Sequence, residues 1–287
     1  MKIEIIDLYA HFSIPRDGAD AGYLKLMIAD ETAKNVTTPR PRPGILICPG
    51  GGYQFVSPRE GEPIALNFLA KGFNAFILDY SVSKPYPNHL IECALAMIYL
   101  RQNNIGCNLI KEKLAIIGFS AGAHLACSLS LLCGKAVLTQ NQTIKTLAGD
   151  KGLEKLLKPN AQILCYPVIT SRKGYSHQGS FENLTLSDSA LSDKVSLEKR
   201  VTKKAPPTFI WHTADDDSVP VFNSLLLANA LSKKGVRYEL HIYEHGTHGL
   251  SVADKTTSAL PPDCSKSVHG WMKNAIDWLI EQNFCIN

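Results

Sequence analysis

The chain has 287 residues, of which 45% are hydrophobic and 20% charged, so it can bury a sizeable core and is not expected to be disordered. Its formal net charge is only +4, and the densest basic group has no aromatic residues interleaved: Lys199, Arg200, Lys203 and Lys204. We interpret this group as a solvated face and expect no nucleic-acid partner.

The first two predicted strands, 3–8 and 23–29, follow each other without a helix between them, which favours an antiparallel pair. The N-terminal residues contain neither the apolar core nor the cleavage site of a signal peptide, so none is predicted. The longest apolar run, at 93–100, is far short of the roughly 18 residues that a membrane span requires. We therefore expect a cytoplasmic protein without a membrane partner.

From position 42 onward, strand and helix patterns alternate along the chain. The strands are mostly continuous apolar runs, which is typical of parallel strands covered on both faces. The pattern predicts strands at 44–50, 74–80, 113–119, 161–168, 208–214 and 236–243, and helices near 61–71, 88–103, 121–133, 220–234 and 266–282. We therefore predict an α/β fold in which helices cover both faces of a mostly parallel sheet.

The alternation breaks at 170–205, a polar stretch with no predicted strand or helix. A segment of that length inside a compact domain is usually functional or mobile. Because it lies between two core strands, we interpret it as a lid or cap. Residues 1–287 are thus expected to form a single domain with a small polar lid as an insertion.

Eight cysteines are present, but none forms a CxxC pair. Four of them stand in apolar runs, as buried reduced thiols do: Cys48, Cys127, Cys133 and Cys165. The sequence has no H-E-x-x-H motif, and no cluster of His, Asp and Glu has the spacing of metal ligands. We therefore predict neither a metal nor another cofactor.

The segment IIGFSAGAHLA, at 116–126, places Ser120 where a buried strand gives way to a helix. Gly118 and Gly122 complete a G-x-S-x-G pattern, in which small residues let neighbouring elements close around a strained serine. A helix N-cap is the alternative reason for a serine at this place. The apolar strand and helix on either side favour a nucleophile at the carboxyl edge of the sheet.

A nucleophilic serine needs a histidine base and a carboxylate that orients the histidine. In a strand–serine–helix fold these residues follow in the order serine, acid, histidine. The acid is expected at the end of a later strand, where TFIWHTADDDSVP supplies Asp215, Asp216 and Asp217.

The base is expected after the last strand, where His245 and His248 are the candidates. We prefer His248, because Gly246 and Gly249 beside it allow the backbone to approach the serine closely.

Acyl transfer also needs N–H donors for the oxyanion, and the N–H of Ala121 is one candidate. The other is expected from CPGGGY, at 48–53, where Gly51 and Gly52 leave backbone N–H groups open to a ligand. A phosphate-binding loop is the alternative, but no GK[ST] sequence follows.

Together these motifs resemble the α/β-hydrolase superfamily, and more narrowly the bacterial esterase/lipase group that includes acetyl-xylan-esterase-like and "sugar hydrolase" proteins. The similar segments are PGGGY, DYSVSKPYP, GFSAGAH, WHTADDDSVPVFNSL and HGTHGL, which fall in the family's order between positions 49 and 250. The resemblance implies an α/β-hydrolase fold, Ser120 as nucleophile and His248 as base. The family's D-x-x-V-P pattern falls on Asp216, whereas counting from the histidine–threonine side favours Asp215 as the acid.

Two departures from the family's pattern concern the same site. Pro49 stands where related esterases usually carry the histidine of His-Gly-Gly-Gly, which affects the expected oxyanion loop. The acid loop follows WHT, at 211–213, where many relatives have HGT, which affects the expected turn.

The function that follows is a serine carboxylesterase that hydrolyses short acyl esters through an acyl-enzyme, with a small-molecule ester as its partner. The resemblance adds acetyl esters of carbohydrates as candidate substrates. One alternative is a prolyl-oligopeptidase-like peptidase, although such enzymes normally carry a propeller domain that 287 residues cannot accommodate. Another is a non-catalytic binding protein of the same fold, although such proteins usually lack a triad residue. The oligomeric state stays open, and a homo-oligomer is compatible with the sequence.

Overall fold

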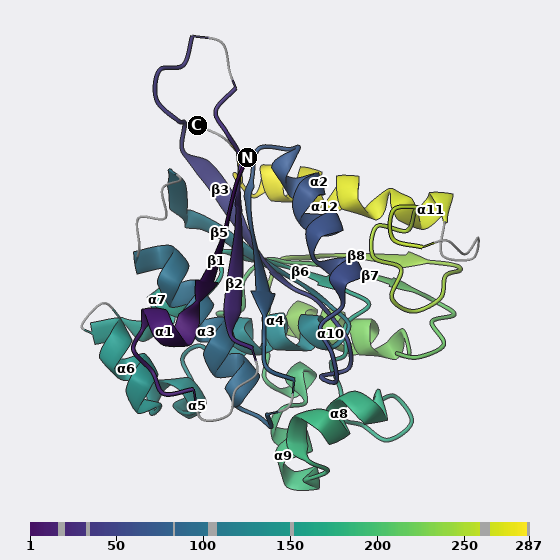
Figure 1. Ribbon diagram of the computed structural model, residues 1–287. Helices are drawn as coiled ribbons and strands as arrows, with labels where there is room; N and C mark the ends of the chain where they lie inside the picture. Colours follow the sequence, from purple (N-terminus) through teal and green to yellow (C-terminus); the bar gives the residue numbers. More distant parts are fainter. Residues whose placement is uncertain are drawn as a thin grey trace.

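The computed structural model describes residues 1–16, 21–32, 35–82, 84–102, 108–149, 152–258 and 265–285, which are built around a twisted central sheet (Figure 1). In these residues the sheet has eight strands in the order β1-β2-β4-β3-β5-β6-β7-β8. The strands are β1 (Lys2–Asp7), β2 (Tyr23–Ile28), β3 (Arg42–Cys48), β4 (Asn74–Asp79), β5 (Leu109–Phe119), β6 (Ala161–Cys165), β7 (Thr208–Thr213) and β8 (Tyr238–Tyr243).

The pairing of the strands confirms the predicted sheet. Strand β2 runs antiparallel to both β1 and β4, and all the other neighbours are parallel. The two strands predicted to pair at the start of the chain therefore do so, and the strands from β3 onward form a parallel block. The carboxyl ends of these parallel strands share one edge, which is where a site is expected in such folds.

Alternate side chains of the central strands enter two apolar cores, one on each face of the sheet. In β3, for example, Leu46 and Cys48 belong to one core and Ile45 and Ile47 to the other. The first core includes apolar side chains of α3 (Asn88–Gln102), α4 (Ala121–Leu132) and α10 (Phe222–Lys233). The second includes those of α2 (Glu62–Leu69) and α12 (Trp271–Glu281). Helices thus cover both faces, as predicted (Figure 1).

Some helix boundaries differ from the prediction. The helix expected at 266–282 is in fact two helices, α11 (Lys266–His269) and α12, because Gly270, a poor helix former, ends the first. The sequence also gave no sign of several helices of about two turns or less, whose length is too short to show a helical period. These are α1 (Leu8–His11), η1 (Pro58–Glu60), α5 (Ala136–Thr139), α6 (Gln142–Ala148) and α7 (Leu153–Leu157).

The segment 170–205 lies between β6 and β7, as predicted, but it contains helices that the sequence analysis did not predict. They are α8 (Gln178–Thr185), α9 (Ser189–Lys194) and the single turn η3 (Leu197–Lys199). Phe181, Leu184 and Leu197 are buried in the same core as α3 and α4. The segment is therefore anchored by a few apolar side chains within a mostly polar stretch. We keep the name "lid" for residues 170–205.

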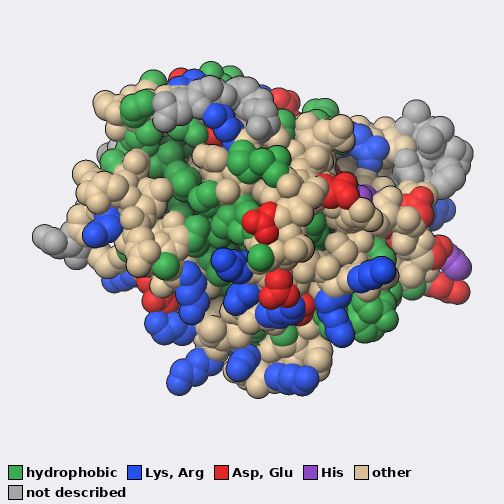
Figure 2. All heavy atoms as spheres, turned by 90° about the horizontal axis from the view of Figure 1, so that it is seen from below, with side chains coloured by type: hydrophobic (Ala, Val, Ile, Leu, Met, Phe, Trp, Pro, Cys, Tyr) green, Lys and Arg blue, Asp and Glu red, His purple; other side chains and the backbone are tan. Residues whose placement is uncertain are grey.

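The predicted basic face carries its own acidic partners. Lys199 forms an ion pair with Asp193, and Lys204 Nζ lies 3.0 Å from Glu154 Oε2. Seen from below, lysine and arginine side chains lie singly or in small groups among polar and acidic ones (Figure 2). The exposed charges on this face are therefore mixed in sign.

The cysteines match the prediction of buried thiols. Five of the six described cysteines are buried and one is exposed, and all six are free of disulfides: Cys48, Cys93, Cys127, Cys133, Cys165 and Cys285. Among the described helices, none combines the length and apolarity needed to cross a membrane.

Candidate active site

Ser120 occupies the sharp turn between β5 and α4. Its backbone φ of 51° lies in the left-handed region, which is strained for a residue with a side chain. The flanking glycines allow the turn to close: a Cβ on Gly118 would lie 2.3 Å from the Gly122 carbonyl oxygen, and one on Gly122 would lie 2.2 Å from the carbonyl oxygens of Cys48 and Pro49. The G-x-S-x-G pattern is thus required by the close approach of α4 to the strand β3.

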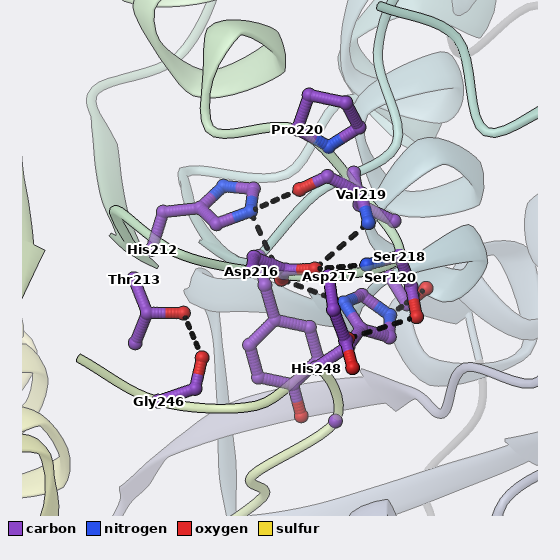
Figure 3. A network of polar contacts seen from close by, with 12 residues as sticks. Ser120, His212, Thr213, Asp216, Asp217, Ser218, Val219, Pro220, Gly246 and His248 are labelled. Carbon is purple, nitrogen blue, oxygen red and sulfur yellow. Dashed lines mark hydrogen bonds and ion pairs between the residues drawn. The ribbon is translucent and has the colours of Figure 1, made fainter.

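The side chains of Ser120, His248 and Asp216 form an unbroken chain of hydrogen bonds (Figure 3). His248 Nδ1 lies 2.7 Å from Asp216 Oδ2, and His248 Nε2 lies 2.8 Å from Ser120 Oγ. Since the ionised carboxylate can only accept, Nδ1 carries the proton and Nε2 is free to accept the serine proton. This is the geometry required for a histidine base that activates a serine.

Asp216 is held by four donors. Its Oδ1 accepts from the N–H groups of Ser218 and Val219, at 3.0 and 2.8 Å, and its Oδ2 accepts from His248 and His212. The side chain is fully buried, and burial alone would raise the pKa of Asp216; the hydrogen bonds from His212 and His248 outweigh it and hold the pKa well below its usual value. Asp216 is therefore an ionised carboxylate that points at the base.

His212, in β7, is a site residue for which the sequence pattern predicted no role. It is completely buried, its Nε2 lies 2.9 Å from the Val219 carbonyl oxygen and 3.2 Å from Asp216 Oδ2, and its Nδ1 lies 2.8 Å from Ser224 Oγ. With Nε2 as the donor, Nδ1 accepts from the serine hydroxyl and every group is satisfied. The signal that could have found it is a histidine four residues before the acid, at the end of a buried strand.

The other two candidate acids point elsewhere. Asp215 is exposed and accepts hydrogen bonds from His245 Nδ1, at 2.9 Å, and from the Gly246 N–H, at 2.8 Å. Asp217 is exposed and accepts from the hydroxyl of Ser218 at 3.1 Å. The structure thus brings Asp216 and His248 to Ser120, and it pairs Asp215 with His245 on the surface.

The predicted oxyanion donors lie in the loop after β3 and at the start of α4. Gly51 and Gly52 have φ values of 125° and 65°, and a Cβ on Gly51 would meet the Phe55 carbonyl oxygen at 2.0 Å, so only glycine fits there. Ala121 is the first residue of α4, where N–H groups have no partner within the helix. Within the described part of the chain, the N–H groups of these three residues have no hydrogen-bond partner, so they are available to a ligand.

The lid reaches the oxyanion loop through α8. Asn183 Nδ2 donates to the Gly52 carbonyl oxygen at 2.9 Å. His177, which caps the start of α8, accepts at Nδ1 from the N–H and hydroxyl of Ser180, so its proton is on Nε2. Burial lowers the pKa of His177, and the charge of nearby His248 adds to this effect. The lid thus contributes a histidine with a lowered pKa near His248.

Among the described residues, no cluster of three or more His, Cys, Asp or Glu side chains could hold a metal ion. The site itself offers a serine hydroxyl, a histidine, a buried carboxylate and open backbone N–H groups.

Comparisons with known proteins identify the family of the chain. Residues 33–231 match the BD-FAE family. The solved structure of an acetyl ester-xyloside bifunctional hydrolase from Caldicellulosiruptor lactoaceticus is 34% identical, covers 92% of this chain and 89% of its own, and has a TM-score of 0.76. That of the carboxylesterase Cest-2923 from Lactobacillus plantarum is 25% identical, covers 100% of both chains, and has a TM-score of 0.84.

A curated relative, endo-1,4-beta-xylanase B from Butyrivibrio fibrisolvens, is 36% identical over 217 residues, or 73% of this chain. The match covers 33% of that relative, so the chain spans about a third of its length. The family match extends over most of the chain and includes the serine turn and the acid loop. The chain therefore belongs to the BD-FAE family, an esterase family with the α/β-hydrolase fold.

Proposed function

We propose that this chain is a serine carboxylesterase that hydrolyses short acyl esters, with acetyl esters of carbohydrates as its substrate class. The observation that carries the proposal is the hydrogen-bonded chain from Asp216 through His248 to Ser120 at a strained strand–helix turn. The carbohydrate part is supported by the relatives, two of which are named as an acetyl ester-xyloside hydrolase and a xylanase.

In the acylation step, Ser120 Oγ attacks the ester carbonyl carbon while His248 Nε2 takes the hydroxyl proton. The carbonyl oxygen becomes an oxyanion, for which the N–H groups of Gly51, Gly52 and Ala121 are the donors. Collapse of this intermediate breaks the bond to the alcohol oxygen, which receives the proton from His248.

Deacylation repeats these steps with water in place of the alcohol. His248 takes a proton from the water, the hydroxide oxygen attacks the acyl carbon, and the Ser120 Oγ leaves with the proton that His248 returns. Asp216 stays ionised throughout and stabilises the protonated imidazole in both steps. No cofactor is needed for this sequence.

The test is a substrate series on the purified chain. kcat/KM is measured on p-nitrophenyl esters from acetyl to dodecanoyl, on acetylated xylo-oligosaccharides, and on a proline peptide substrate. We expect acetyl to butyryl esters to be preferred, release of acetate from the oligosaccharides, and no peptide cleavage. A preference for dodecanoyl esters would indicate a lipase, cleavage of the peptide a peptidase, and failure of a fluorophosphonate to label Ser120 a protein without this chemistry.

A further inference from the structure

A second buried carboxylate, Glu60, lies behind the candidate site and is absent from the mechanism above. It is the last residue of η1 and is 4% exposed. Its Oε2 accepts from the Gly50 N–H at 2.7 Å, and its Oε1 accepts from the Tyr166 hydroxyl at 2.6 Å. Gly50 begins the loop that holds the oxyanion donors, so Glu60 fixes the base of that loop.

Tyr166 continues the connection to the histidine loop. Its hydroxyl oxygen accepts from the Ser251 N–H at 3.0 Å, and its ring meets the His248 ring edge-on, with the centroids 5.1 Å apart. The Ser251 hydroxyl donates to the Arg59 carbonyl oxygen at 2.6 Å, and the Arg59 guanidinium donates to the Gly249 carbonyl. The single turn η1 therefore contacts both loops that flank Ser120.

Both carboxylate oxygens of Glu60 accept hydrogen bonds, which favours its ionised form. Each of its oxygens faces a donor, the Gly50 N–H or the Tyr166 O–H, and the Tyr166 oxygen already accepts from Ser251. A proton on Oε1 would compete with the Tyr166 hydroxyl hydrogen, and a proton on Oε2 would compete with the Gly50 N–H. Burial raises the pKa of Glu60 above its ordinary value, and the hydrogen bonds from Tyr166 and Gly50 and the charge of His248 offset this only in part.

Several charged or titratable groups surround His248. Asp216 contacts it from the acid loop, His177 lies near it on the lid, and Glu60 faces it from behind the Tyr166 ring. Arg59 is the cation next to Glu60, and it is bonded to the histidine loop at Gly249. Glu60 is thus a buried carboxylate, in addition to Asp216, that would interact with a protonated His248.

We propose that Glu60 is a positioning residue for the ester hydrolysis. It holds the oxyanion loop through Gly50 and the histidine loop through Tyr166, and its negative charge stabilises protonated His248 in the transition state. This inference rests on the proposed function, but it makes an independent prediction about the titration of His248.

The test compares Glu60→Gln with Glu62→Gln in the full chain. Glu62 lies two residues away on α2, is exposed, and forms an ion pair with Lys25, so its replacement changes the net charge equally without touching the site. For Glu60→Gln we expect kcat on p-nitrophenyl acetate to fall about ten- to hundredfold, while KM changes less than about threefold. The acid limb of the kcat/KM profile should move to lower pH by about 0.5 unit or more, since a nearby negative charge is lost.

Tyr166→Phe is the second variant, because it keeps the ring against His248 and the charge of Glu60 while it removes one hydrogen bond. We expect kcat to fall about tenfold without a downward move of the acid limb. An unchanged kcat in this variant would overturn the positioning role even if Glu60→Gln failed to fold. Thermal unfolding of both variants serves as the folding control.

A third readout separates this inference from the proposed function. The ring signals of His248 are titrated by NMR in ¹⁵N-histidine-labelled protein, without substrate. Glu60→Gln should lower the titration midpoint relative to Glu62→Gln, whether or not an ester is hydrolysed. Equal midpoints in the two variants would overturn the electrostatic role, whereas a lower midpoint in Glu60→Gln together with absent esterase activity in the wild type would overturn the proposed function alone.

Discussion

The acid loop and the histidine loop are joined by two Asp–His pairs that differ in their surroundings. In the buried pair, His248 Nδ1 lies 2.7 Å from Asp216 Oδ2, and the side chains of Asp216 and His248 are 0% and 17% exposed. In the exposed pair, His245 Nδ1 lies 2.9 Å from Asp215 Oδ2, and the side chains of Asp215 and His245 are 52% and 75% exposed. The two distances are nearly equal, but water screens the charges of the exposed pair and leaves its side chains free to separate. The comparison teaches that burial and the hydrogen bond to Ser120, rather than the Asp–His contact itself, distinguish the pair that we propose as catalytic.

The largest expected effect comes from removing the hydroxyl of Ser120, to which the buried pair is hydrogen-bonded through His248. Ser120→Ala should lower kcat on p-nitrophenyl acetate by about 10⁴–10⁶, because the three residues act as a unit. The fold should persist, since the smaller side chain eases the strained turn. Steady-state kinetics and circular dichroism measure the two effects.

The control for this variant is Ser218→Ala. Ser218 is an exposed serine in the acid loop, and its backbone N–H to Asp216 remains after the change. We expect near-normal activity and full fluorophosphonate labelling in this variant, and no labelling in Ser120→Ala. Substantial ester hydrolysis by Ser120→Ala would show that another residue is the nucleophile.

The second expected effect separates the two acids directly. Asp216→Asn should lower kcat by about 10³–10⁴, because the amide favours the wrong tautomer of His248. Asp215→Asn should lower it by no more than about tenfold, because an exposed carboxylate is screened by solvent. The two variants differ by one position and make the same chemical change, so each is the control for the other.

A large loss in Asp215→Asn with a small one in Asp216→Asn would reverse the assignment of the acid. The remaining triad residues would be unaffected by that result. Equal losses in both variants would instead show that the acid loop works as a whole, and the contrast between the buried and the exposed pair would disappear.

The buried pair could be predicted from the sequence because each of its residues is tied to a local requirement. Ser120 follows an apolar strand and needs glycines at 118 and 122, and the elbow geometry bears this out. The resemblance singled out Asp216 through Val219 and Pro220, and the N–H of Val219 indeed donates to that carboxylate. The alternation of strands and helices likewise predicted the parallel sheet, since buried parallel strands need continuous apolar runs.

What the sequence could not predict depends on contacts between distant residues. Glu60 and Tyr166 are 106 residues apart and meet only in the folded chain. His212 looked like any residue in a buried strand, although its role comes from the turn that brings Asp216 back to it. In the lid, Phe181 and Leu184 are too few apolar positions to reveal α8 against its polar background.

A third, smaller effect tests how the buried pair is held. His212→Gln should lower kcat by roughly tenfold, about 1.4 kcal/mol, because Asp216 loses one of its four donors but keeps the other three. KM should change little, since His212 is fully buried and exposes no surface that a substrate could contact.

Ser224→Ala is the matched control for this variant. It removes the hydroxyl that donates to His212 Nδ1 and leaves the contact to Asp216, so we expect a smaller loss. A loss in His212→Gln as large as that in Asp216→Asn would mean that the acid cannot stay in place without this histidine. Unchanged kcat would mean that the contact is structural only.

The smallest expected effect concerns the exposed pair, and its sign follows from the two shifted pKa values. The hydrogen bond with Asp215 raises the pKa of His245 above 6.5, so this contribution to stability is complete below pH 6.5 and is lost as the pH rises through the folded-state pKa. The hydrogen bond with His245 lowers the pKa of Asp215 below 3.8, so that contribution is present above pH 3.8 and is lost as the pH falls through the folded-state pKa. Both contributions to stability are complete only between pH 3.8 and 6.5.

His245→Ala should therefore lower Tm slightly between these pH values but not at pH 9. The difference in Tm should vanish in 1 M NaCl, where the Debye length is about 3 Å. Activity relative to wild type should stay within about threefold at every pH, because His245 is exposed and is paired with Asp215 rather than with Ser120. A loss of kcat that follows the titration of His245 would contradict this, and it would make the exposed pair part of the catalytic machinery.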